Sequence, residues 1–132
     1  MDQFLNIFFF VFHSLWMLFN CVGWIGKRTR PWHLLTILLT AASWLLIAWW
    51  CEYPLGYCVC TDWHWRARDR LGYHNDPSYT QQMVRSFTGL EVSHGLADSV
   101  TVSVMVVVTL LTLILNLRDF LRWWRSRPPA KS

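Results

Sequence analysis

The stretch FLNIFFFVFHSLWMLFNCVGWI, residues 4–25, decides the fold because it contains no Asp, Glu, Lys or Arg. Its length matches the roughly 20 helical residues that cross a hydrocarbon core of about 30 Å. Basic residues follow this stretch, at Lys27, Arg28 and Arg30, whereas a cleaved signal peptide has them in front of its apolar part. The stretch therefore predicts a transmembrane helix that is retained in the mature protein.

Two further apolar stretches occupy residues 31–50 and 96–117. Pro31 suits the first turn of the second helix, since a residue there needs no amide donor. The third stretch is rich in Val, Leu and Thr and is followed by a basic tail, residues 118–132. The chain is too short for a separate soluble domain, so one membrane domain is expected over residues 1–132. The predicted fold class is an all-α membrane protein with three transmembrane helices.

Basic residues cluster on one predicted side of the membrane. Three lie between the first two helices and five lie in the tail, while residues 51–95 hold four Arg against several acids. The positive-inside rule therefore predicts a cytoplasmic C-terminus, an external N-terminus and an extracytoplasmic lid formed by residues 51–95. The basic residues form no stripe interleaved with exposed aromatics, so nucleic acid is not expected as a partner. The expected partners are the lipid bilayer and larger membrane proteins.

The extracytoplasmic lid is expected to hold two short amphipathic helices. Thr61 or Asp62 can cap the first, which ends near Gly72. Asp76 and Pro77 suit the start of the second, whose apolar face is expected on the membrane or on the helix bundle. Ten Trp in so small a chain also favour contacts at headgroup level. The residues predicted to form interfaces are Trp49, Trp50, Tyr79, Met83, Phe87, Trp123 and Trp124.

His13 is the classically ionisable residue deep within a predicted span, and a polar group in hydrocarbon is a candidate functional site because stranding it is costly. At about 1.5 Å per residue, His13, Ser43 and Met105 lie at the same depth. A hydrogen bond from His13 to Ser43 or Ser103 is the structural interpretation. The functional alternatives are a haem held by His13 and Met105, a pairing known in cytochromes, or a quinone contact at His13.

Three cysteines, Cys51, Cys58 and Cys60, are expected just outside the membrane, where disulfides form and persist. One disulfide among them is predicted, which leaves one thiol unpaired. His64 adds a fourth ligand type, and three Cys with one His form a set that zinc accepts, although the gap between Cys58 and Cys60 is narrower than usual. Cys58, Cys60 and His64 are therefore the candidate metal ligands. Cys21 is interpreted as a packing residue.

Several local patterns resemble a family of small bacterial membrane proteins defined only as a domain of unknown function, number 2784. They are the Phe12-His13-Ser14-Leu15-Trp16 start, the Pro31-Trp32-His33 turn, the tryptophan-rich second helix that ends at Cys51, the Tyr53-Pro54-Leu55 stretch and the arginine-rich segment from Trp63 to Gly72. The family shows a Cys-Pro-Leu-Thr stretch where this sequence has the interrupted Cys51-Glu52-Tyr53-Pro54-Leu55. The resemblance implies a bacterial inner membrane and brings no assigned activity.

The sequence contains no nucleophile elbow, phosphate loop, dinucleotide fingerprint or zinc-protease helix, so it gives no support for an enzyme. Three spans offer few internal helix contacts, which favours packing against larger membrane proteins. The expected function is therefore a non-catalytic accessory or structural subunit of a membrane complex. The alternatives are a small haem- or quinone-binding redox protein that uses His13, and an extracytoplasmic metal or thiol-disulfide protein that uses Cys58, Cys60 and His64.

Overall fold

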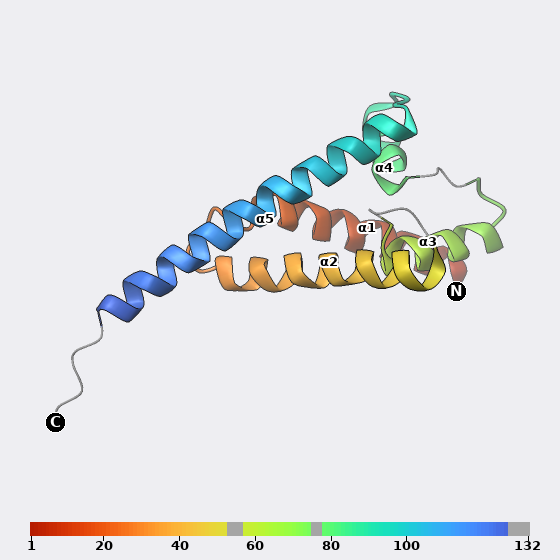
Figure 1. The fold of residues 1–132 in the computed structure, drawn as a ribbon. Helices are drawn as coiled ribbons and strands as arrows, with labels where there is room; N and C mark the ends of the chain where they lie inside the picture. The colour runs from red at the N-terminus through yellow and green to blue at the C-terminus, as the bar shows by residue number, and fades with distance from the viewer. Residues whose placement is uncertain (53–56, 75–77, 127–132) are drawn as a thin grey trace.

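The computed structural model describes residues 1–52, 57–74 and 78–126, without the side chain of Cys51. Over these residues it contains helices and no strand, as the sequence predicts (Figure 1). Three long helices form the body, and two short ones follow the second of them. The helices are α1 (Asp2–Val22), α2 (Arg30–Cys51), α3 (Val59–Arg70), α4 (Tyr79–Thr88) and α5 (His94–Arg125).

Three helices, α1, α2 and α5, are long and apolar enough to cross a membrane, which confirms the predicted number of spans. Their bounds differ from those expected. The first helix ends at Val22 rather than Ile25, because the turn into α2 already begins at Gly23. The last continues from His94 to Arg125 without a break, so at about 1.5 Å per residue it exceeds the hydrocarbon thickness of about 30 Å. Its basic end projects beyond α1 and α2 (Figure 1).

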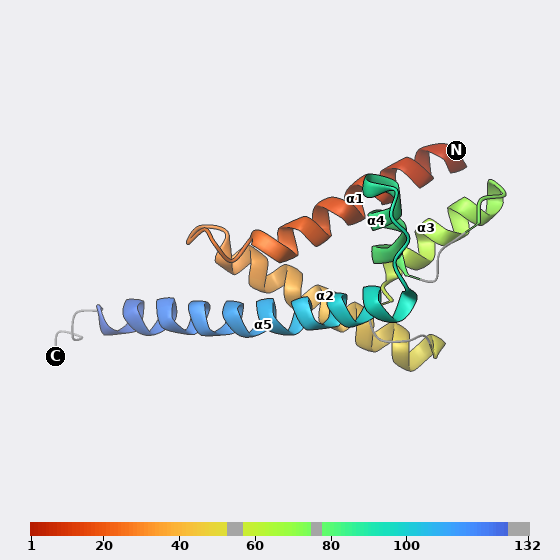
Figure 2. The same ribbon diagram turned by 90° about the horizontal axis from the view of Figure 1, so that it is seen from above.

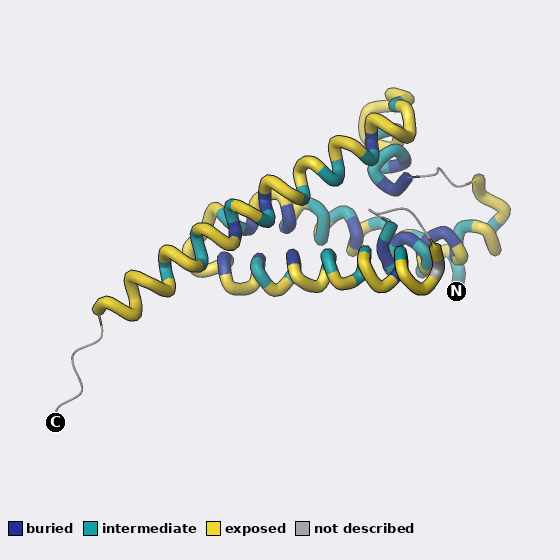
Figure 3. The backbone as a smooth tube through the Cα atoms, viewed as in Figure 1, coloured by how far each residue is buried: buried dark blue, intermediate teal, exposed yellow. Residues whose placement is uncertain are grey.

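Burial in this bundle is reversed relative to a water-soluble protein. Large apolar side chains cover the outside, among them Trp50, which is 91% exposed, while the buried side chains include His33 and Thr112, both 0% exposed. The exposed positions run along the outer faces of all three long helices (Figure 3). Lipid can cover such a surface, whereas polar groups inside the bundle need internal hydrogen-bond partners.

A tight turn joins α1 to α2 and places His33 between three helices. Thr29 Oγ1 donates to the Gly23 carbonyl at 2.7 Å, and a Cβ added to Gly23 would meet the His33 ring at 2.7 Å. His33 Nε2 lies 2.8 Å from the Asn20 carbonyl of α1, and Nδ1 lies 2.8 Å from Thr112 Oγ1 of α5. The carbonyl can only accept, so Nε2 carries the proton, while Nδ1 contacts a Thr112 hydroxyl that also donates to the Val108 carbonyl at 2.6 Å. His33 therefore ties α1, α2 and α5 together.

The segment between α2 and α5 folds back along α1. Helix α3 packs beside the N-terminal half of α1 in two perpendicular views (Figures 1 and 2). Arg70 at its end forms an ion pair with Asp2 at 2.9 Å, while Cys58 at its start lies 3.3 Å from His13 in the middle of α1. The two helices therefore run antiparallel, and α3 reaches halfway down the first span.

The two short helices exist as predicted, with shifted starts. Helix α3 begins at Val59 with Cys58 as its N-cap, so Thr61 and Asp62 lie inside its first turn rather than at the cap. Its end agrees with the prediction, since Gly72 follows with a φ of +75°, a conformation that glycine adopts without strain. Asp76 and Pro77 lie outside the described residues. The α4 face is divided: Tyr79 is buried, whereas Phe87 is exposed.

Candidate functional site

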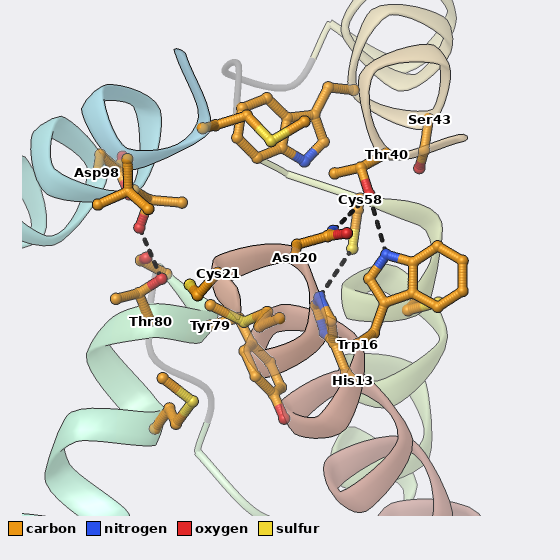
Figure 4. A pocket seen from close by; sticks show the side chains of 18 of the residues that line it. His13, Trp16, Asn20, Cys21, Thr40, Ser43, Cys58, Tyr79, Thr80 and Asp98 are labelled. Atoms are coloured by element: carbon orange, nitrogen blue, oxygen red, sulfur yellow. Dashed lines mark hydrogen bonds between the residues drawn. The ribbon is translucent and has the colours of Figure 1, made fainter. Parts of the chain in front are cut away.

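A cavity of about 450 Å³ lies between α1, α2 and α5, with the start of α3 and one face of α4 also lining it (Figure 4). It reaches His13, which is about 15 Å from either end of α1, so the site lies at the middle of the first span. Most of the wall is apolar. The polar side chains that line it are His13, Asn20, Thr40, Ser43, Ser78, Tyr79, Thr80, Asp98 and Thr101, together with the thiols of Cys21, Cys58 and Cys60.

The Cys58 thiol contacts the His13 imidazole on one wall of this cavity. Cys58 Sγ lies 3.3 Å from His13 Nε2 and 3.2 Å from Thr61 Oγ1, and all three side chains are buried. The neighbouring Cys60 thiol and then His13 lower the pKa of Cys58 below its ordinary value, while the pKa of Cys60 is raised. Cys58 also stands at the N-cap position of α3, without a side-chain capping hydrogen bond, and the positive end of a helix favours a thiolate. The arrangement is a buried thiol–imidazole pair in which the pKa of the thiol is lowered.

Tyr79 holds the His13 ring in place from α4. The two ring centroids are 4.0 Å apart, and the Tyr79 hydroxyl donates to the Phe10 carbonyl at 2.9 Å. Because that proton is used, Ser14 donates to the Tyr79 oxygen at 3.0 Å. Burial raises the pKa of Tyr79 to about 12, so the phenol stays protonated at physiological pH. Tyr79 therefore has a positioning role here, in addition to the interface role predicted for it.

His13 has a different partner from the two serines considered in the sequence analysis. Ser43 Oγ instead accepts from the backbone N–H of Val59, at 3.1 Å, which fixes the start of α3 against α2. His13 Nδ1 is buried without a hydrogen-bond partner. Met105 of α5 lines the same cavity, so the structure brings the two predicted cofactor residues to one space. The His13 nitrogen Nε2 is already engaged by Cys58.

A second group of hydrogen-bonded polar side chains surrounds Asn20, which lies seven residues beyond His13 on α1. Thr40 Oγ1 accepts from Asn20 Nδ2 and from Trp16 Nε1, each at 2.9 Å, and donates to the Thr36 carbonyl at 2.8 Å. Asn20 is only 7% exposed, yet its side-chain oxygen Oδ1 has no partner. The cavity wall thus carries two buried polar side chains with one atom each unsatisfied, His13 and Asn20.

His64 does not join the two cysteines. It lies further along α3, where its Nε2 donates to Asn6 Oδ1 at 2.8 Å, whereas the Cys58 thiol contacts His13. Within residues 1–52, 57–74 and 78–126, no group of three or more His, Cys, Asp or Glu side chains could hold a metal ion. The three candidate metal ligands are therefore not assembled. Cys58 and Cys60 are both free thiols, so the predicted disulfide is not formed in this structure.

His64 makes stability depend on pH. Burial, followed by the charge of Arg68, lowers the pKa of His64 to about 4 from 6.5. Between these two pH values the unfolded chain binds a proton that the folded chain does not, so the free energy of unfolding should fall as pH drops from 6.5 to 4. Unfolding in mixed micelles across this range measures the slope. A His64→Gln variant, which keeps a donor for Asn6, should flatten it, whereas His74→Gln at an exposed position should leave it unchanged. An equal slope in both variants would contradict the assignment.

The remaining predicted interface residues lie on the outside or on the cavity. Met83 lines the cavity. Those exposed on the surface are Trp49, Trp50, Phe87, Trp123 and Trp124. Whether a protein or lipid contacts them stays a prediction.

Comparison with known proteins places the chain in a family. The model of the family described as "Protein of Unknown function (DUF2784)" matches residues 3–117, which is most of the chain, so the chain belongs to this family. The resemblance seen in the sequence is thereby confirmed. No curated protein and no solved structure matches the chain.

Proposed function

We propose that this member of the DUF2784 family binds one membrane-soluble small molecule in the cavity between α1, α2 and α5. The observation that carries the proposal is the unsatisfied pair on its wall, Asn20 Oδ1 and His13 Nδ1. A buried polar atom without a partner costs about 1–3 kcal/mol, and a ligand that supplies the partner removes this cost. Three other polar atoms on the α1 wall, Trp16 Nε1, Asn20 Nδ2 and His13 Nε2, already have partners within the chain, and these contacts hold the site in shape.

The position and size of the cavity favour a ligand that arrives through lipid. A volume of about 450 Å³ is within the range of small-molecule sites, which are mostly apolar with a few convergent polar groups. Three of the lining helices are long and apolar enough to span a membrane, and the site lies midway along the first of them. A water-soluble ligand would have to leave water to reach it, whereas an apolar ring or chain is already at this depth.

We place the protein in the bacterial inner membrane with its C-terminus in the cytoplasm. In support, Lys27 and Arg28 of the α1–α2 turn lie at the same end of the bundle as Arg118, Arg122 and Arg125 of α5 (Figure 1). Cytoplasmic ends carry such an excess of basic residues. The accessory-subunit role stays a prediction, because the exposed apolar surface is equally suited to lipid.

A Val104→Trp variant should lose the ligand. Val104 lines the cavity from α5, and an indole ring at this position takes up space that a ligand needs. The measurement is native mass spectrometry of the chain extracted in mild detergent, followed by solvent extraction and identification of the small molecule that co-purifies. We expect one bound molecule per chain in the unmodified protein and at least a tenfold lower occupancy in Val104→Trp.

Val107 provides the matched control. It lies one turn from Val104 on the same helix but is 56% exposed and does not line the cavity. Val107→Trp makes the same chemical change on the outer face, so it should keep the bound molecule. A bound molecule that survives equally in both variants lies elsewhere on the chain, and the proposal then fails. A chain that carries no molecule in any variant also contradicts it.

A further inference from the structure

We propose that Cys58 and Cys60 form a dithiol that reduces a quinone-class ring bound in the cavity, becoming a disulfide as the quinone becomes the quinol. This inference rests on the ligand site proposed above and names the class of its ligand. It assigns a reaction to two side chains that the binding proposal leaves without a role. Its elements are the thiol–imidazole pair, the second thiol two residues away and the apolar space that both thiols line.

The geometry prepares Cys58 as the attacking sulfur. Its Sγ is held by His13 Nε2 at 3.3 Å and by Thr61 Oγ1 at 3.2 Å, and Cys58 occupies the N-cap position of α3, a helix of 12 residues. An imidazole that can take up the thiol proton and a helix N-terminus both favour a thiolate. Cys60 lies in the same first turn and is half-buried on the same cavity wall. The pair therefore has one activated sulfur and one sulfur positioned to resolve the bond that the first one forms.

The position of Cys58 limits the class of oxidant that can reach its thiol. Cys58 lies beside the middle of α1, so a disulfide on a water-soluble protein cannot reach it, but a lipid-soluble molecule can. Quinones are the class of lipid-soluble compound that accepts two electrons and two protons, which are what a dithiol gives up when it becomes a disulfide. Aromatic rings suited to pack on a flat ring line the cavity at Trp16, Trp44 and Tyr79. The unpartnered Asn20 Oδ1 can accept from a quinol hydroxyl.

The reaction balances within these groups. Cys58 passes its thiol proton to His13, and the thiolate adds to a ring carbon, forming a C–S bond, while His13 hands that proton to the ring oxygen. Cys60 then passes its proton to His13, and its sulfur attacks Cys58 Sγ. The S–S bond forms, the C–S bond breaks with its electron pair returning to the ring, and His13 delivers the second proton. The dithiol loses two electrons and two protons, and the quinone gains both.

The test uses the full chain, reduced and placed in lipid nanodiscs without oxygen, with decylubiquinone as the probe. Quinol formation is followed by ultraviolet absorbance and the cysteines are mapped by peptide mass. We expect one quinol per chain and a new bond between Cys58 and Cys60. Cys60→Ser should abolish quinol formation, whereas Val107→Ser, a change on the outer face of α5 that does not touch the cavity, should leave it intact. Asn20→Leu should weaken the binding of decylubiquinol, whose hydroxyl can donate to Asn20 Oδ1, at least tenfold as measured by quenching of tryptophan fluorescence.

The outcomes separate this inference from the binding proposal. Decylubiquinone that quenches tryptophan fluorescence but leaves both thiols reduced overturns the dithiol reaction and leaves the ligand site in place. Quinol that forms equally in Cys60→Ser also overturns it. A chain that keeps a co-purified molecule but excludes decylubiquinone shows that the ligand is of another class, which refutes this inference alone. Loss of quinol formation in Cys60→Ser with intact quenching and an unchanged helical spectrum supports it.

Discussion

Replacing His33 with alanine is expected to lower the free energy of unfolding by about 3–4 kcal/mol. The side chain is 0% exposed and makes one hydrogen bond to the Asn20 carbonyl and one to Thr112, on two other helices. Each interhelical bond contributes roughly 1 kcal/mol in a membrane protein. The alanine also leaves a cavity, which adds roughly 2 kcal/mol because the surrounding helices relax only in part.

Unfolding in mixed micelles with increasing denaturing detergent measures this loss. Trp32→Ala is the control, because Trp32 is the neighbouring residue but is 67% exposed, so its truncation removes surface rather than a tie between helices. Thr112→Val keeps the shape of the side chain and removes one of the two bonds, so it should cost roughly 1 kcal/mol. A His33→Ala variant that loses no more stability than Trp32→Ala would show that His33 does not hold the three helices together.

The spans were predictable from local sequence because each is a long apolar run with at most one charged residue, Asp98 in the third, and lipid requires such runs to be helical. The position of His13 near the middle of α1 also followed from counting residues. The hydrogen-bond partners of these polar residues could not be predicted in this way. Counting residues gives a position along the helix axis, but it does not give the side of the helix from which a side chain projects. Counting placed Ser43 at the same level as His13. In the structure Ser43 lies beside the start of α3, but its hydroxyl accepts a hydrogen bond from the Val59 amide instead of bonding to His13.

The spacing of polar residues along α1 is a sequence signal for the site. Asn6, His13 and Asn20 are spaced by seven residues, so they fall on one helical face. Each bonds a different part of the chain: Asn6 to His64, His13 to Cys58, and Asn20 to Thr40. Three polar residues in register on a helix that has no charged residue after Asp2 predict a face turned toward protein rather than lipid.

The packing of α3 against α1 could not be predicted from the sequence. The helix carries Asp62, Arg66, Asp69 and Arg70, a mixture of charges that is typical of a solvated surface. Its other face buries Thr61, His64, Trp65 and Ala67 against α1. That face is polar and aromatic rather than aliphatic, so hydrophobic periodicity is weak, and no local rule states how far a loop folds back between spans. The proximity of Cys58 and His13 depends entirely on this docking.

Replacing His13 with phenylalanine is expected to slow alkylation of Cys58 by N-ethylmaleimide at pH 7 by about tenfold. Without the imidazole, the sulfur loses the partner that lies 3.3 Å away and that helps to keep it ionised. The fraction of thiolate then falls at neutral pH. The loss in rate is smaller than the loss in thiolate, because a thiol of higher pKa is intrinsically more nucleophilic once ionised.

The pH profile of this reaction separates activation from a change in access. In the unmodified chain the Cys58 rate should stay flat around neutral pH, because a thiol of lowered pKa is already ionised there. In His13→Phe the rate should rise about tenfold per pH unit, as for an ordinary thiol below its pKa. Thr61→Val, which removes the other contact to Sγ at 3.2 Å, serves as the comparison and should shift the profile less. A phenylalanine variant that lowers the rate equally at every pH has only narrowed the path to the sulfur, and His13 would then have no part in activating Cys58.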